Sequence, residues 1–269
     1  MKDFLKKAYK FSNSWTGTII IVLFVIFFVA QAFRIPSGSM KDSLLIGDHL
    51  FAKKFAYGIP MPHIPFLEIS IMPWSDSLRL MDGDKPKRGD VVIFRYPDNP
   101  KQHFVKRCVA LPGDELFVEN KDLFIHFKEG DDWIEENYKG YEMELHDKKL
   151  WVENPYMKEH PGIHHDGKII NDGHFPQPIF FVKPLKVEEG KYFMMGDNRD
   201  HSNDSRFWGA VPYENIEGTP WFVYFSIDEN WEIRWDRVGK TPTDLEEPLH
   251  LEKAIEERKR TDKEYYGIT

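Results

Sequence analysis

The stretch RGDVVIFRYPDNPKQHFVKRCVALPGD, residues 88–114, decides the fold class of this chain. Its two halves, 88–97 and 102–114, are rich in β-branched and aromatic residues, and DNPK at 98–101 is a typical turn sequence. The pattern therefore predicts a β-hairpin. In the second strand, every other residue from Phe104 to Ala110 falls on one face, and Lys106 lies on that face among apolar neighbours.

Further strand signals lie on both sides of this hairpin. Residues 50–58 and 218–228 each indicate one strand, 115–127 indicate a second hairpin, and 191–216 indicate a strand that runs into a long polar turn. An aromatic content of 15%, together with 18 Gly and 18 Pro, supports a mostly β body.

Three segments lack a clear strand pattern. Residues 59–87 predict an ordered but irregular loop, in which residues 71–74 suit a membrane surface. Residues 128–190 form a polar insertion. The charged tail at 244–267 predicts a solvated helix after Pro248, or a partly disordered segment.

The N-terminus is basic and then strongly apolar. Four lysines against one aspartate give residues 1–15 a charge of 4 − 1 = +3, and no charged residue follows until after Phe33. Eighteen helical residues at 16–33 rise about 27 Å, close to the thickness of a bilayer core. We expect a transmembrane helix at 16–33, with residues 1–15 in the cytoplasm. The alternative is a cleavable signal peptide with Ala30-Gln31-Ala32 as its cleavage site.

The bulk composition excludes some classes of protein. A net charge of −8 argues against nucleic acid as a partner. The single cysteine, Cys108, rules out an intramolecular disulfide and is expected to be a small core residue. His160, His164, His165 and His174 match no standard set of zinc ligands, so we expect no metal site and no cofactor.

The residues that could carry chemistry begin with two serines. Ser37 and Ser39 lie in a Pro-Ser-Gly-Ser turn, and a serine needs a nearby base to act as a nucleophile. Lys106 could be that base if burial moves its pKa from about 10.4 toward 8, a change of roughly 3 kcal/mol. The pattern alone leaves the plainer alternative open, in which the serines are turn residues and Lys106 reaches water or an acid.

The segment GDNRDHSNDSR, residues 196–206, is dense in residues that order turns through side-chain hydrogen bonds. Its acidic residues alternate with Arg199 and Arg206, which argues against a metal loop. Asp204 and Arg206 lie two residues apart and could form an ion pair. The pattern therefore favours a rigid turn that delivers a hydroxyl group to a site.

Four blocks of sequence together resemble the bacterial type I signal peptidases, a family of serine proteases with a Ser–Lys dyad. They follow the apolar segment in this order: FRIPSGSM (33–40), GDHLFAKKFAYG (47–58), RGDVVIFRYP (88–97) with HFVKRCVALPGD (103–114), and GDNRDHSNDSRFWGAVP (196–212). The resemblance covers most of residues 30–120 and 188–226.

The resemblance implies a role for individual residues of this chain. Ser39 is the nucleophile and Lys106 the general base, while the Ser37 side chain and the Ser39 N–H form the oxyanion hole. Four residues support the dyad: Ser202, Asp197, Asp204 and Arg206. Seven match segments that line shallow pockets for small side chains: Phe33, Ile35, Pro36, Met40, Leu44, Phe104 and Val105.

The resemblance also implies an architecture of five parts. They are a cytoplasmic segment (1–15), a transmembrane helix (16–33), a catalytic core of coiled antiparallel sheets (34–114 and 188–240), an inserted β subdomain (115–187) and a charged tail (241–269). We expect a single-pass protein of the bacterial inner membrane with a periplasmic catalytic domain.

The activity that the resemblance implies is cleavage of signal peptides from exported preproteins after small residues at −3 and −1. The partners are then preprotein signal peptides and the lipid bilayer. Slow self-cleavage after Ala30-Gln31-Ala32 is a further expectation. One rival is a self-cleaving repressor, which the lack of a DNA-binding region opposes. The other is a membrane-anchored β-rich module that binds partners without catalysis.

Two positions depart from the family pattern. Lys41-Asp42-Ser43 stand where the family usually has a proline within SM-x-P-T-L, which predicts a looser and more charged loop behind Ser39. His103 stands where an acidic or polar residue is common, which predicts a different outer pocket.

Overall fold

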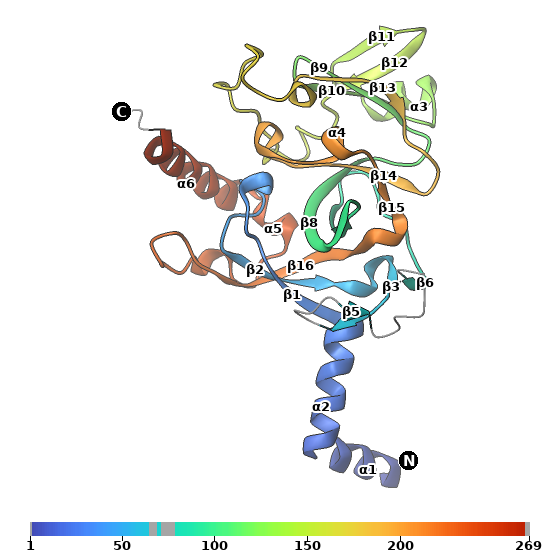
Figure 1. Cartoon of the computed structure of the whole chain (residues 1–269), viewed down its shortest axis with the longest axis vertical. Coiled ribbons are helices and arrows are strands. Elements are labelled where there is room, and N and C mark those ends of the chain that lie inside the picture. Colours follow the sequence, from blue (N-terminus) through green and yellow to red (C-terminus); the bar gives the residue numbers. More distant parts are fainter. Residues whose placement is uncertain (1, 65–68, 71–78, 267–269) are drawn as a thin grey trace.

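The computed structural model describes residues 2–64, 69–70 and 79–266. Most of the chain forms antiparallel β-sheets, as the sequence predicts, and the body is built from a seven-stranded and a five-stranded sheet. Figure 1 shows the two sheets stacked along the long axis of the molecule, with the N-terminal helices projecting from one end. The expectation that residues 71–74 suit a membrane surface lies outside the described residues.

The N-terminal region contains two helices followed by a strand. α1 spans Lys2–Ser12, and α2 spans Trp15–Phe24 and continues as one π-helical turn, Val25–Val29. The Ser14 side chain caps α2 by accepting a hydrogen bond from the Gly17 N–H. Among the described residues, no helix combines the length and apolar character needed to cross a membrane.

The predicted helix at 16–33 is therefore wrong at its C-terminal end. β1 spans Ala30–Arg34 and pairs with β2, Asp48–Lys53, so the backbone groups of these residues bond to a neighbouring strand rather than within a helix. The Ala30-Gln31-Ala32 triplet lies in this strand. The Lys54 amine also donates a hydrogen bond to the Gln31 side chain at 3.0 Å.

The seven-stranded sheet has the order β1-β2-β16-β7-β8-β14-β15. Its remaining strands are β16 (Ile216–Ser226), β7 (Val91–Tyr96), β8 (Asn99–Ala110), β14 (Lys191–Met195) and β15 (Val211–Pro212). β7 and β8 confirm the predicted central hairpin, but Tyr96 already pairs with Asn99, so the turn is shorter than residues 98–101. The long second strand carries Lys106 into the middle of the sheet.

The five-stranded sheet has the order β11-β12-β10-β9-β13. Its strands are β11 (Met143–His146), β12 (Lys149–Glu153), β10 (Asp122–His126), β9 (Glu115–Glu119) and β13 (Phe181–Lys186), and helix α3 (Asp131–Asn137) lies beside it. The predicted hairpin at 115–127 is confirmed. Asn120 and Lys121 form its turn with φ of 50° and 83°, the left-handed pair that suits the twist of a hairpin.

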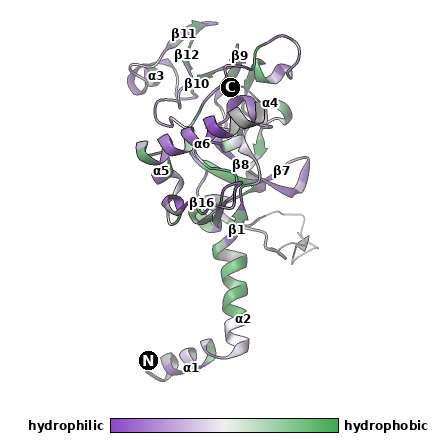
Figure 2. Cartoon of the chain, turned by 90° about the vertical axis from the view of Figure 1, so that its left-hand side faces the viewer, coloured by the Kyte–Doolittle hydropathy of each residue, from purple (hydrophilic) through white to green (hydrophobic). Residues whose placement is uncertain are grey.

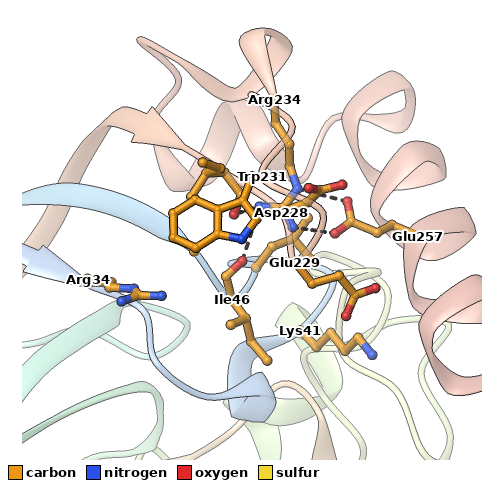
Figure 3. Close-up of a pocket in the computed structure, with 11 residues that line it drawn as sticks. Arg34, Lys41, Ile46, Asp228, Glu229, Trp231, Arg234 and Glu257 are labelled. Atoms are coloured by element: carbon orange, nitrogen blue, oxygen red, sulfur yellow. Dashed lines mark hydrogen bonds and ion pairs between the residues drawn. The ribbon is translucent and has the colours of Figure 1, made fainter. Parts of the chain in front are cut away.

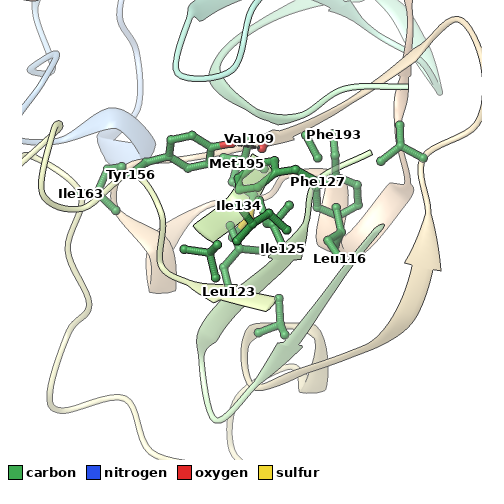
Figure 4. Packing of buried hydrophobic residues seen from close by; sticks show 14 residues of the cluster. Val109, Leu116, Leu123, Ile125, Phe127, Ile134, Tyr156, Ile163, Phe193 and Met195 are labelled. Atoms are coloured by element: carbon green, nitrogen blue, oxygen red, sulfur yellow. Dashed lines mark hydrogen bonds between the residues drawn. The ribbon is translucent and has the colours of Figure 1, made fainter. Parts of the chain in front are cut away.

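One hydrophobic cluster joins the two sheets. Leu116, Leu123 and Ile125 of the smaller sheet pack against Val109 and Phe193 of the larger one (Figure 4), and all five are buried. The five-stranded sheet, which is formed by the chain between β8 and β14, is therefore held to the seven-stranded sheet by a shared hydrophobic core.

The segment at 59–87 contains more pairing than the expected irregular loop. β3 (Gly58–Pro60) pairs with β6 (Arg79–Asp82), and β4 (His63–Ile64) pairs with β5 (Ile69–Ser70). These are two small sheets separate from the seven-stranded and five-stranded sheets.

The C-terminal segment forms two helices, α5 (Pro242–Leu245) and α6 (Pro248–Tyr266). The helix predicted after Pro248 is confirmed, but the expectation that it is simply a solvated helix is wrong. Leu251 and Ala254 of α6 are buried against the body, and Leu245 of α5 is completely buried. The apolar residues of this charged tail therefore dock it on the body of the molecule.

Candidate active site

Ser39 lies in a short 3₁₀ turn, Gly38–Met40, within the connection between β1 and β2. We call residues 35–48 the Ser39 loop. The N–H of Ile35 donates to the Asp48 carbonyl at 2.8 Å, which closes the base of this loop. Met40 is buried in a cluster with residues of β2, β7 and β16, so the turn is fixed from below. Ser39 itself is only 8% exposed.

Lys106 of β8 approaches this turn from the neighbouring part of the sheet. Its Nζ donates hydrogen bonds to Ser39 Oγ at 2.7 Å and to the Val105 carbonyl at 2.9 Å. The same nitrogen lies 5.2 Å from the centre of the Phe104 ring. Lys106 is 4% exposed, so its amine does not reach bulk water. The structure thus brings together the two residues that are 67 positions apart in the sequence.

The burial of Lys106 changes its protonation. Loss of solvent lowers its pKa from 10.5 to about 8, although the negative charges of Asp204 and Asp197 act in the opposite direction. Both carboxylates are paired with arginines, which weakens that opposing effect. A substantial fraction of Lys106 is therefore neutral near pH 8 and able to accept a proton.

Asp204 and Arg206 form the ion pair that their spacing suggested. Arg206 Nε lies 2.8 Å from Asp204 Oδ1, and both side chains are fully buried. Asp204 also accepts hydrogen bonds from the Gly196 N–H at 3.0 Å and from the Arg206 N–H at 3.2 Å. Burial raises the pKa of Asp204, but the charge and hydrogen bonds of Arg206 together with hydrogen bonds from Gly196 and Ser202 bring it below its ordinary value, so the carboxylate stays ionised. The pair fixes the polar turn at 196–206.

Asp197 connects this turn to the Ser39 loop and to β8. It accepts two hydrogen bonds from the Arg107 guanidinium, at 2.8 and 2.6 Å, and one from Ser43 Oγ at 2.5 Å. Arg107 is only 1% exposed, so this ion pair is buried. Burial raises the pKa of Asp197, but Arg107, Ser43 and Arg199 together bring it below its ordinary value.

Asn198 is a residue of the site that the sequence interpretation missed. Its N–H donates to the Ser39 carbonyl at 3.1 Å, and its side-chain amide donates to the Gly38 carbonyl at 3.0 Å. Both contacts hold the backbone that carries the Ser39 hydroxyl. An asparagine in a polar turn is common, so no sequence signal separated it from its neighbours.

The two other serines occupy different positions. Ser37 Oγ lies 3.5 Å from Ser39 Oγ on the exposed side of the loop. Ser202 is buried beside Gly196. Its hydroxyl lies close enough to the Asp204 carboxylate to help lower the pKa of that group, and its support of Lys106 stays a prediction.

A cavity of about 420 Å³ contains the Ser39 and Lys106 side chains. Six of the seven expected pocket residues line it: Phe33, Ile35, Pro36, Met40, Phe104 and Val105. Leu44 does not line it, because this side chain is completely buried in the cluster beneath the loop. His103 also lines the cavity, and its Nε2 lies 3.0 Å from the buried Glu217 carboxylate.

Gly196 lies where a side chain has no room, and its replacement by alanine should displace the site. A Cβ atom there would lie 2.5 Å from the Ser39 carbonyl oxygen and would also overlap the Ser202 side chain. We expect Gly196→Ala to lower peptidase turnover by about 100-fold, since displacement of a reacting group by 1 Å has effects of that size. Gly167→Ala is the matched control, because no atom lies within 4 Å of its Cβ position. Equal turnover of the two variants would contradict this prediction.

The chain is similar to known proteins over most of its length. Residues 9–225 match the family model described as "Signal peptidase, peptidase S26". Signal peptidase I of Helicobacter pylori (strain J99) is 42% identical over 289 aligned positions, which cover 93% of this chain and 99% of that protein. Signal peptidase I of Pseudomonas fluorescens is 37% identical and covers 82% of this chain and 73% of that protein.

A crystal structure of a signal peptidase I from Enterococcus faecalis aligns with 51% of this chain and 97% of its own, at 25% identity and a TM-score of 0.32. The family assignment therefore rests on the sequence matches. The chain belongs to the signal peptidase I family of serine peptidases.

Proposed function

We propose that this protein is an endopeptidase that removes signal peptides from exported preproteins, with Ser39 as nucleophile and Lys106 as general base. The observation that carries the proposal is the 2.7 Å hydrogen bond between Lys106 Nζ and Ser39 Oγ in a buried site. A serine becomes nucleophilic when a base next to it can take its proton. The pKa of about 8 for Lys106 suits that task near neutral pH.

The proposed reaction proceeds through an acyl-enzyme. Ser39 Oγ attacks the scissile carbonyl carbon while Lys106 takes the hydroxyl proton, and Lys106 then gives that proton to the leaving amine. Water, deprotonated by Lys106, attacks the ester and releases Ser39. The Ser39 N–H and the Ser37 hydroxyl stabilise the oxyanion, a contribution of about 3–4 kcal/mol for one donor in comparable enzymes.

The proposed specificity is for small side chains at −3 and −1. The cavity beside the dyad is walled by Ile35, Met40 and Val105, which are large apolar residues close to the reacting atoms. A pocket that these side chains fill accepts small residues and rejects bulky ones. The test is cleavage of a purified preprotein, with mass spectrometry of both products. A single cut after a small-x-small sequence is expected, and no cut by wild-type protein would refute the function.

We also propose that residues 16–29 anchor the protein in the bacterial inner membrane, with residues 1–15 in the cytoplasm and the β body in the periplasm. Figure 2 shows the apolar helix α2 standing away from the body. Its large apolar side chains are exposed, among them Trp15, Ile19 and Phe24. A helix that is apolar on all sides needs a nonpolar environment.

The anchor predicts how the protein fractionates. After lysis and a wash at high pH, which removes peripheral proteins, the full chain should remain with the membrane pellet. A variant that lacks residues 2–29 should lose most of this membrane retention. N-terminal sequencing of the pelleted protein distinguishes an intact anchor from cleavage at Ala30-Gln31-Ala32. Release of the full chain into the wash would contradict the anchor.

A further inference from the structure

The C-terminal segment, residues 241–266, packs against the Ser39 loop. It lies beyond residue 225, where the match to the family model ends. Figure 1 shows α5 and α6 beside the connection between β1 and β2. Leu245 of α5 is completely buried in the same cluster as Met40 and Leu44. The tail therefore supplies part of the packing directly beneath the turn that carries Ser39.

Asp42 of the Ser39 loop forms an ion pair with this tail. Asp42 is 1% exposed and has a φ of +80°, a left-handed conformation that aspartate and asparagine tolerate better than other non-glycine residues. Arg258 Nη1 of α6 lies 2.8 Å from Asp42 Oδ2. A buried carboxylate is costly unless a positive charge compensates it. The ion pair therefore stabilises the loop at the position where the sequence departs from its family.

His164 also faces Asp42 but does not supply the compensating charge at neutral pH. Its Nδ1 lies 3.3 Å from Asp42 Oδ2. Burial lowers the pKa of His164 to about 4, although a hydrogen bond to the Gly162 carbonyl acts against this shift. The ring is therefore neutral near pH 7. Arg258 provides a full positive charge to Asp42 under those conditions.

Two further contacts tie the same tail to the loop from other directions. Glu246, at the end of α5, pairs with Arg107, which in turn binds Asp197. Glu257 of α6 pairs with Arg234 (Figure 3), and Arg234 Nη1 donates to the Ile46 carbonyl in the Ser39 loop at 3.1 Å. The tail thus contacts the loop directly through Leu245 and Arg258 and indirectly through Arg107 and Arg234.

We propose that Arg258 is a positioning residue for the nucleophile, which holds Ser39 in register with Lys106 by fixing Asp42 three residues further along the loop. The inference rests on the proposed function, because it assigns a role in the geometry of the Ser39–Lys106 pair. Arg258 touches neither reacting residue. Its effect is transmitted through the backbone between Ser39 and Asp42.

The test measures preprotein cleavage by four variants of the full chain. Arg258→Gln removes the full positive charge that lies 2.8 Å from the buried Asp42 carboxylate, so kcat should fall by about 10-fold or more while KM stays within about threefold. Asp42→Asn keeps a residue that tolerates the left-handed conformation and removes the charge. The double variant leaves no unpaired charge, so its kcat should exceed that of Arg258→Gln alone. Arg260→Gln is the matched control, because its pair with Asp228 is longer, at 3.7 Å, and more exposed.

The outcomes separate the positioning role from a merely structural one. A kcat for Arg258→Gln within threefold of the control would overturn the inference, even if the melting temperature fell. Strictly additive losses in the double variant would also overturn it, since they would show that Asp42 and Arg258 do not act as a pair. Absence of cleavage by the wild-type protein would instead refute the proposed function, so the two failures are distinguishable.

Discussion

Replacement of Ser39 by alanine is expected to lower the rate of preprotein cleavage by about 10⁵-fold or more, which leaves no measurable product in a standard assay. Without Oγ there is no acyl acceptor, and the neutral Lys106 amine has no hydroxyl to deprotonate. The cavity and the pocket residues stay in place, so substrate binding should change little. Product formation followed by mass spectrometry over a long incubation measures the loss.

The design of this experiment has to separate chemistry from folding. Ser12→Ala is the control, because Ser12 lies in α1 and its hydroxyl bonds only to the Tyr9 carbonyl among the described contacts. Ser39→Ala should melt within a few degrees of wild type, since it removes one hydroxyl group from a short turn. A folded Ser39→Ala variant that still cleaves at more than about 1% of the wild-type rate would exclude Ser39 as the nucleophile.

The strands β7, β8, β9, β10 and β16 were predictable because each depends on local patterns, whereas the pairing within residues 59–87 and the strands β11, β12 and β13 were not located from the sequence. The runs of β-branched and aromatic residues in β7 and β8 and the Asn-Lys turn between β9 and β10 are set by residues close in sequence. The helix at 16–33 was overestimated, because the apolar run continues through Ala30–Arg34 while β2 supplies backbone partners for these residues. Composition does not distinguish an apolar helix residue from an apolar strand residue at such a boundary.

The site was predictable where chemistry marks a residue, and not where geometry alone does. A lysine on the apolar face of a strand is an unusual signal, and Lys106 is buried as that pattern required. Asn198 and Gly196 act through contacts with a loop about 160 positions earlier, and no local pattern reports such contacts. The Asp42–Arg258 pair joins residues more than 200 positions apart, and the charged sequence of α6 resembles any solvated helix.

Replacement of Lys106 by methionine is expected to lower cleavage by about 10⁴-fold or more, while the protein melts at no lower temperature than wild type. Methionine has a similar length and no charge, so it fills the same space without the desolvation cost that lowers the pKa of Lys106 from 10.5 to about 8. Loss of activity without loss of stability would identify the amine as the base. Lys101→Met is the control, since Lys101 is exposed on the same strand. A Lys106→Met variant with more than about 1% of wild-type activity would exclude this base.

The pH dependence of the wild-type enzyme tests the same amine without a substitution. Only the neutral amine accepts a proton, so kcat/KM should rise tenfold per pH unit below about pH 8 and level off above it. At pH 6 the rate should therefore be about 100-fold below its plateau. Burial favours the neutral amine, so the rise of kcat/KM with pH should occur below the ordinary lysine pKa of 10.5. An apparent pKa near 10.5 for this rise would show that burial does not lower the pKa of Lys106. An apparent pKa near 6.5 that persists in Lys106→Met would assign the base to a histidine instead.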